Sequence, residues 1–136
     1  MPKANEVQVG GSHYKTEYQH WDFTADVLEG RYMEGQIAKY ISRARKKNGA
    51  ADYRKAEHFC AKLLEQGSIP PSGSPEDQRL TTKFCEANDL TDLEAFALHQ
   101  LAGWSTVGDL HTVLCAAAFL AEQLEAIPEV KPKVKK

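Results

Sequence analysis

Residues 33–65 read MEGQIAKYISRARKKNGAADYRKAEHFCAKLLE, and this stretch decides the fold. Apolar residues recur in it at the spacing of one helix face, first as Ile37, Tyr40, Ile41 and Ala44, then as Tyr53, Ala56, Cys60, Leu63 and Leu64. Asn48-Gly49 separates the two series, and both residues tolerate the positive φ that ends a helix. The stretch therefore predicts two helices joined as a hairpin, with Asp52 in the first turn of the second.

The polar faces of this hairpin are strongly cationic. From Arg31 to Lys55 there are eight Lys or Arg residues against two acids. The side chains expected on the two polar faces are Lys39, Arg43 and Lys46 on the first helix and Lys55, His58 and Lys62 on the second. Such a cluster predicts either a site for a phosphate group or a solvated helix surface.

The composition indicates a soluble globular chain. It has 136 residues, 42% of them hydrophobic and 26% charged, which suits one domain or two very small ones. The longest strongly apolar run, Val113 to Ala121, is too short to cross a bilayer, and the amino terminus does not resemble a secretory signal. Cys60, Cys85 and Cys115 each follow a helical pattern beside apolar neighbours, so we expect core residues and no disulfides. A cytoplasmic location fits these features.

Charge is distributed unevenly along the chain. Residues 67–127 contain two basic and nine acidic residues, whereas residues 128–136 contain four basic and one acidic. An acidic half beside a local cationic hairpin argues against a protein that coats extended nucleic acid. It leaves room for a small anionic ligand.

The amino-terminal region adds two short motifs. Gly10-Gly11-Ser12-His13-Tyr14-Lys15 predicts a turn, or a nest of backbone N–H groups that faces an anion, although it lacks the spacing of a Walker loop. Trp21 and Phe23 are predicted core anchors, with stacking on a nucleobase as an alternative for Trp21. Asp22 is predicted to cap a helix from about Phe23 to Leu28.

The second half predicts three further helices. Residues 67–78 form a Pro- and Gly-rich linker whose end overlaps the first helical pattern, and residues 128–136 form a disordered basic tail. Helical patterns run over Glu76–Asn88, Asp92–Trp104 and Asp109–Ala126. Thr91 or Asp92 is expected to cap the middle helix and Asp109 the last.

The two halves also resemble each other. Phe23–Leu28 aligns with Phe84–Leu90, Met33-Glu34 with Leu93-Glu94, and Asp52 with Asp109. The cationic positions are not kept, because Lys39 aligns with His99 and Lys55 with Thr112. We therefore expect an all-α bundle of two related helical hairpins about a pseudo-twofold axis, with an irregular Gly-rich segment at the amino terminus. In it, residues 79–127 are a degenerate second repeat packed on the first; the alternative is chance similarity between two amphipathic hairpins.

The polar motifs of the first half occur in a specific order. They are Val9-Gly10-Gly11-x-His13-Tyr14-Lys15, Trp21-Asp22-Phe23, Glu34-Gly35-x-x-x-Lys39-Tyr40-x-x-Arg43, and Lys46-Lys47-Asn48-Gly49-x-x-Asp52-x-x-Lys55-Ala56-x-His58. Together they resemble a family of small bacteriophage proteins called nucleotide kinase-like, because a phage deoxynucleoside monophosphate kinase carries the same module. The resemblance covers about residues 7–66 of the module predicted at residues 1–66. Ser12, His20 and Tyr53 depart from the family pattern, which has an acid, Pro and Leu there.

The resemblance implies a nucleotide site and assigns roles to residues. Phosphate oxygens would be held by basic side chains and the glycine turn, that is by Gly10, Gly11, His13, Lys15, Lys39, Arg43, Lys46, Lys55 and His58. Tyr14 or Trp21 would stack on the base, and Tyr40 is a further candidate ligand-binding residue. Asp22, Glu34 or Asp52 would orient an attacking phosphate or, in a kinase, bind Mg²⁺; no recognised zinc spacing is present.

Three functions remain open from the sequence. The first is phosphoryl transfer to a deoxynucleoside monophosphate in the host cytoplasm. The second is nucleotide binding without turnover, which the loss of the acid at Ser12 and the absence of a donor-nucleotide loop favour. The third is inhibition of a host protein through the acidic second half. A homo-oligomer is compatible with all three, and no membrane contact is expected.

Overall fold

The computed structural model describes residues 18–67, 70 and 74–127, and in these residues helices are joined by turns and short irregular segments, with no strand. The elements are α1 (His20–Asp26), α2 (Tyr32–Arg43), the short 3₁₀ helix η3 (Ala44–Lys46), α3 (Ala50–Gln66), α4 (Pro75–Ala87), α5 (Asp92–Ala102) and α6 (Val107–Glu125). The predicted all-α bundle is confirmed. Among the described helices, none combines the length and the hydrophobicity that a membrane span requires.

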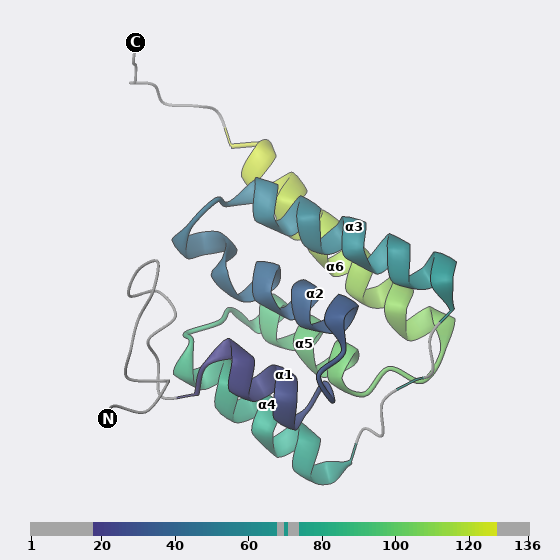
Figure 1. Ribbon diagram of the computed structural model, residues 1–136. Coiled ribbons are helices and arrows are strands. Elements are labelled where there is room, and N and C mark those ends of the chain that lie inside the picture. Colours follow the sequence, from purple (N-terminus) through teal and green to yellow (C-terminus); the bar gives the residue numbers. More distant parts are fainter. Residues whose placement is uncertain (1–17, 68–69, 71–73, 128–136) are drawn as a thin grey trace.

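The helices form three stacked pairs. Figure 1 shows α1 beside α4, α2 beside α5 and α3 beside α6, and each of these pairs is in contact. α2 also packs on α3, and α5 on α6, so that the two hairpins lie against each other. A pseudo-twofold arrangement would pair each helix with its counterpart in this way, and the internal repeat itself stays a prediction.

The core runs through all three pairs. Phe23 of α1 stacks on Phe84 of α4 with ring centroids 4.5 Å apart, and both side chains are fully buried. The apolar faces predicted for residues 33–65 are buried as expected at Ile37, Ile41, Ala44, Tyr53, Ala56, Cys60 and Leu63. Facing them from the second half are Leu98, Leu101, Val113 and Ala117. This burial supplies the main driving force for the fold.

Helix starts differ from the prediction at two aspartates. α1 begins at His20 because the Gln19 N–H donates to Asp22 Oδ2 (3.2 Å), which makes Asp22 a first-turn residue and not the N-cap. α6 begins at Val107, where Thr106 accepts from the Asp109 N–H and Asp109 accepts from the Thr106 N–H, each at 3.2 Å. Both aspartates thus occupy the third position of a capping arrangement, three residues after the true cap.

The break between the first two long helices falls at the predicted place. α2 ends at Arg43, η3 follows, and Gly49 adopts φ +58° directly before α3. A side chain at that φ would be strained, so glycine suits the position. The predicted linker is too long at its end, because α4 begins at Pro75 and residues 75–78 are helical.

Two buried carboxylates join the halves. Glu34 at the start of α2 accepts from Trp104 Nε1 (3.2 Å), which lies between α5 and α6. Glu94 at the start of α5 accepts from Arg45 Nε (3.1 Å) and from the Tyr53 hydroxyl, which belong to η3 and α3. Each hairpin therefore supplies a buried carboxylate that binds the segment joining the two helices of the other hairpin.

The three cysteines divide into two classes. Cys60 and Cys85 are buried, as predicted, and burial raises the pKa of both thiols to about 12. Cys115 is exposed on α6, so its predicted place in the core is wrong. The thiolate is the reactive form, so the two buried thiols with raised pKa react poorly. Cys115 is therefore the thiol of the native protein that a reagent can reach.

Candidate functional site

The tyrosine ring of Tyr40 is the centre of a cationic cluster. Lys39 Nζ and Arg43 Cζ on α2 lie 5.3 and 4.7 Å from the ring centroid, and Lys55 Nζ on α3 lies 5.2 Å from it. These distances are within the range of cation–π attraction. Phe59 of α3 stacks on the Tyr40 ring, with 5.9 Å between the ring centroids, and holds it in place.

Asp52 is the counterion of these cations. Its carboxylate is fully buried, and it accepts from Arg43 Nε at 3.1 Å, with Lys55 Nζ at 3.9 Å. Asn48 Nδ2 adds a third donor at 3.4 Å. We refer to Lys39, Tyr40, Arg43, Asp52 and Lys55 as the Tyr40 cluster; with three cations and one carboxylate, it carries a net positive charge.

α1 brings His20 to the edge of the cluster. His20 Nε2 donates to the Gly35 carbonyl (2.7 Å), and Thr24 Oγ1 lies 3.1 Å from the same nitrogen. A Cβ added at Gly35 would lie 3.0 Å from Thr24 Cγ2, so glycine permits this close approach of α1 and α2. Sequence reasoning did not assign His20 to the site; its place beside Trp21-Asp22 was the available signal.

Stability is expected to depend on pH through His20. Burial lowers the pKa of His20, and the positive charges of Lys39 and Arg43 lower it further. The hydrogen bond to the Gly35 carbonyl acts in the opposite direction and raises it. The unfolded chain, with a His pKa of about 6.5, then binds the proton more readily, so the free energy of unfolding should fall as the pH drops below about 6.5.

Urea unfolding at about pH 7.5 and about pH 5.5 measures this loss. His20→Asn should show a smaller loss than wild type, whereas His111→Asn, at an exposed position on α6, should keep the wild-type difference. An equal loss in all three proteins would contradict the assignment to His20.

The candidate carboxylates are engaged in packing. Glu34 is 2% exposed, and its Oε2 accepts from Trp104 and from Arg31 Nη1 (3.2 Å). Asp52 is held by Arg43, and Asp22 accepts from the Gln19 N–H in the first turn of α1. These placements do not fit the predicted roles of Glu34 and Asp52 in orienting an attacking phosphate. In the described part of the chain, no group of three or more His, Cys, Asp or Glu residues is placed to hold a metal ion.

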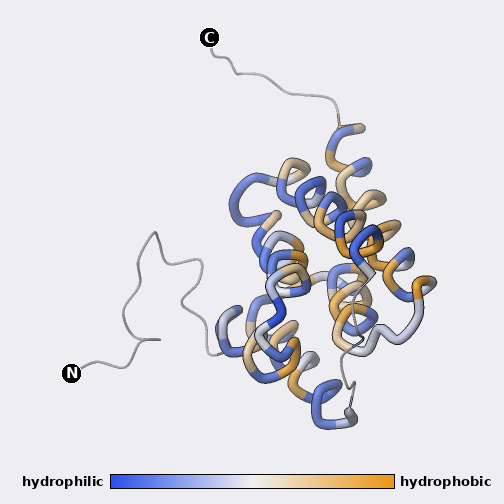
Figure 2. Tube along the Cα trace, turned by 45° about the vertical axis from the view of Figure 1, so that its right-hand side comes forward, coloured by the Kyte–Doolittle hydropathy of each residue, from blue (hydrophilic) through white to orange (hydrophobic). Residues whose placement is uncertain are grey.

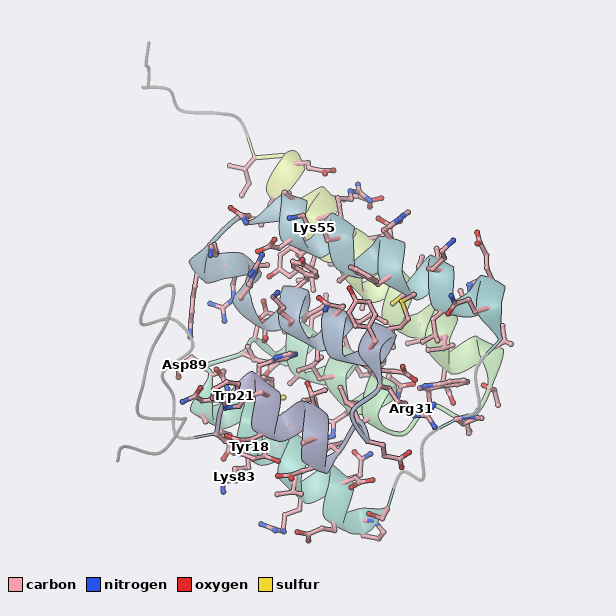
Figure 3. All side chains as sticks on the ribbon, in the orientation of Figure 1. Tyr18, Trp21, Arg31, Lys55, Lys83 and Asp89 are labelled. Atoms are coloured by element: carbon pink, nitrogen blue, oxygen red, sulfur yellow. The ribbon has the colours of Figure 1, made fainter. Side chains whose placement is uncertain are left out.

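The remaining predicted residues lie in several places. Lys46 Nζ donates to the Asn88 carbonyl (3.2 Å) at the end of α4, so it joins the halves and not the Tyr40 cluster. His58 lies beside Phe59, with ring centroids 6.5 Å apart. Figure 3 shows Trp21 on α1 and Lys55 on α3, with α2 between these helices. Trp21 is 51% exposed, so its predicted place in the core is wrong. Gly10, Gly11, His13, Tyr14 and Lys15 lie outside the described residues.

Comparison with known proteins gave one match. Residues 9–61 match the model of a family described as a protein of unknown function (DUF3310). This range includes α1, α2 and most of α3, and with them the whole Tyr40 cluster. The searches of curated proteins and of solved structures found no match.

Proposed function

We propose that this protein binds a small phosphorylated ligand, most specifically a nucleotide, at the Tyr40 cluster and does not turn it over. The observation that carries the proposal is the convergence of Lys39, Arg43 and Lys55 on one ring, with Asp52 as their buried counterion. Lys55 comes from a different helix from the other two cations, so the cluster is a product of the fold and not of one charged helix face.

The geometry of the cluster supports phosphate binding. Asp52 fixes Arg43 through Nε and Nη2, at 3.1 and 3.5 Å, which pre-orients the guanidinium before any ligand arrives. The Lys55 side chain remains 50% exposed, so its ammonium is accessible to an anion. Pre-oriented guanidinium and ammonium groups are the donors that phosphate oxygens prefer.

The carboxylates support binding over catalysis. A kinase needs groups that position the acceptor and the metal-bound donor. Glu34 and Asp52 are 2% and 0% exposed and already hold donors of the protein itself. The resemblance to phage proteins supports a nucleotide as the ligand and the cytoplasm of an infected host as the setting.

Calorimetric titration of the full chain with deoxynucleoside monophosphates, triphosphates and inorganic phosphate tests the proposal. We expect saturable binding that weakens as salt rises, and a loss of about tenfold in affinity, or ~1.4 kcal/mol, for Lys39→Gln and for Lys55→Gln. Lys62→Gln is the matched control, because Lys62 is an exposed lysine of the same helix α3 that pairs with Glu65 (3.8 Å).

Two results would contradict the proposal. Affinity equal to wild type in both cluster variants would place the ligand elsewhere. Conversion of a monophosphate to a diphosphate in the presence of a triphosphate and Mg²⁺, abolished by Arg43→Ala, would replace binding with phosphoryl transfer.

A further inference from the structure

An open apolar groove lies on the outer face of the α5–α6 hairpin. Its volume is about 430 Å³, and its lining includes Leu93 and Phe96 of α5 and Cys115, Ala116 and Phe119 of α6. Phe96 and Phe119 remain 47% and 50% exposed. Figure 2 shows hydrophobic positions along the length of α6. Aromatic side chains gathered around an exposed hollow are a feature of interaction surfaces.

Two aromatic residues of the α2–α3 hairpin, Tyr40 and Phe59, are covered, unlike Phe96 and Phe119. There Phe59 stacks on Tyr40, and Lys39 and Lys55 lie over the tyrosine ring, so these two rings are covered by side chains of the same hairpin. On α5–α6, no lysine or arginine is present from residue 92 to residue 125, so no long cationic side chain of these helices can cover Phe96 or Phe119.

Acidic residues lie at both ends of the groove. Asp92 is one turn before Phe96 on α5, and Glu122 is one turn after Phe119 on α6. Asp109 lies one turn before Thr112, which also lines the groove. Backbone hydrogen bonds from Ser105 and Thr106 lower the pKa of Asp109, so it is negatively charged at neutral pH. The groove therefore has an apolar floor with negative charge at its ends.

We propose that this groove binds a basic amphipathic helix of a partner protein. The groove is lined by two adjacent helices, and an amphipathic helix can place apolar side chains, spaced about one turn apart, against such a surface. Lysine or arginine residues flanking that apolar stripe would face Asp92, Asp109 and Glu122. The opposite charges give both the orientation of the bound helix and discrimination against acidic helices. This site is separate from the Tyr40 cluster and does not depend on the nucleotide proposal.

A labelled synthetic peptide of about 18 residues tests the proposal, with leucines along one helical stripe and lysines elsewhere. Fluorescence anisotropy should show saturable binding to the full-length protein. Phe119→Ala and Glu122→Lys should each weaken it at least about tenfold, and both positions are exposed enough for the fold to tolerate the change. Tyr32→Ala, which removes a 67% exposed aromatic residue on α2, should leave it unchanged.

Two further measurements locate the peptide and test its charge. Modification of Cys115 by a thiol reagent should slow when the peptide is bound, since this thiol lines the groove. A second peptide, with glutamate in place of every lysine, should not bind.

Three outcomes would overturn the proposal. The first is equal affinity for the lysine and glutamate peptides, or no binding of either. The second is a protein dimer in ultracentrifugation that Phe119→Ala dissociates, because the occupant would then be a second copy of the chain. The third is peptide binding that leaves Cys115 fully reactive.

Discussion

Replacement of Arg45 by alanine is expected to lower the free energy of unfolding by about 3–5 kcal/mol, because it leaves a buried carboxylate without its cation. Glu94 is fully buried and accepts from Arg45 Nε at 3.1 Å through both of its oxygens. Tyr53 also donates to this carboxylate, but a neutral hydroxyl cannot replace the charge. The Arg45 side chain also donates to the Asp89 carbonyl, so the variant loses a contact with the end of α4 as well.

Denaturant unfolding measures this change, and the chain supplies a matched control. Arg54 is about as exposed as Arg45, at 37% against 38%, but its partners Glu57 and Glu125, each at 2.7 Å, are 29% and 45% exposed, whereas Glu94 is fully buried. Arg54→Ala should therefore cost no more than about 1 kcal/mol. Adding Glu94→Gln to Arg45→Ala should recover part of the loss, since the unpaired charge disappears. A similar small loss for Arg45→Ala and Arg54→Ala would show that Glu94 does not need its cation.

Phe23→Ala is expected to destabilise the protein by about 3–5 kcal/mol. Phe23 is fully buried, and its ring stacks on Phe84 with an interplanar angle of 15°. α1 has only seven residues, so its position depends on this contact between α1 and α4. The variant should also lose the pH dependence assigned to His20, because α1 holds that histidine against Gly35.

Phe96→Ala is the control for this variant. Phe96 is 47% exposed, so its truncation should cost about 1 kcal/mol or less. Urea unfolding followed by circular dichroism compares the two variants with wild type. A loss below about 1.5 kcal/mol for Phe23→Ala would mean that α1 contributes little to the folded state.

The sequence predicted the helices well because their signals are local. The spacing of Ile37, Ile41, Ala56 and Cys60 identifies the buried faces, and Gly49 identifies the break. The errors of a few residues at Asp22 and Asp109 have one cause. Aspartate is favoured both at the cap and three residues later, and a single sequence does not distinguish these two positions.

The candidate site was predicted only in part, because several partners come from distant parts of the chain. Lys39, Arg43 and Lys55 share a polar surface that helical periodicity identifies. Glu34 gave no local sign that Trp104, 70 residues away, would bury it and donate to it. For the same reason the sequence places Lys46 among the ligand-binding residues, although it donates to the Asn88 carbonyl, 42 residues away.

The proposed binding of a phosphorylated ligand at the Tyr40 cluster can be observed residue by residue. Its most direct test is an amide NMR titration of the full chain with a deoxynucleoside monophosphate. We expect the largest shifts at residues 39–43 and 52–59, together with an upward shift of the His20 pKa as a phosphate approaches, and we expect Lys39→Gln/Lys55→Gln to abolish both. Shifts confined to α5 and α6, or saturable binding that leaves residues 39–43 unchanged, would contradict it.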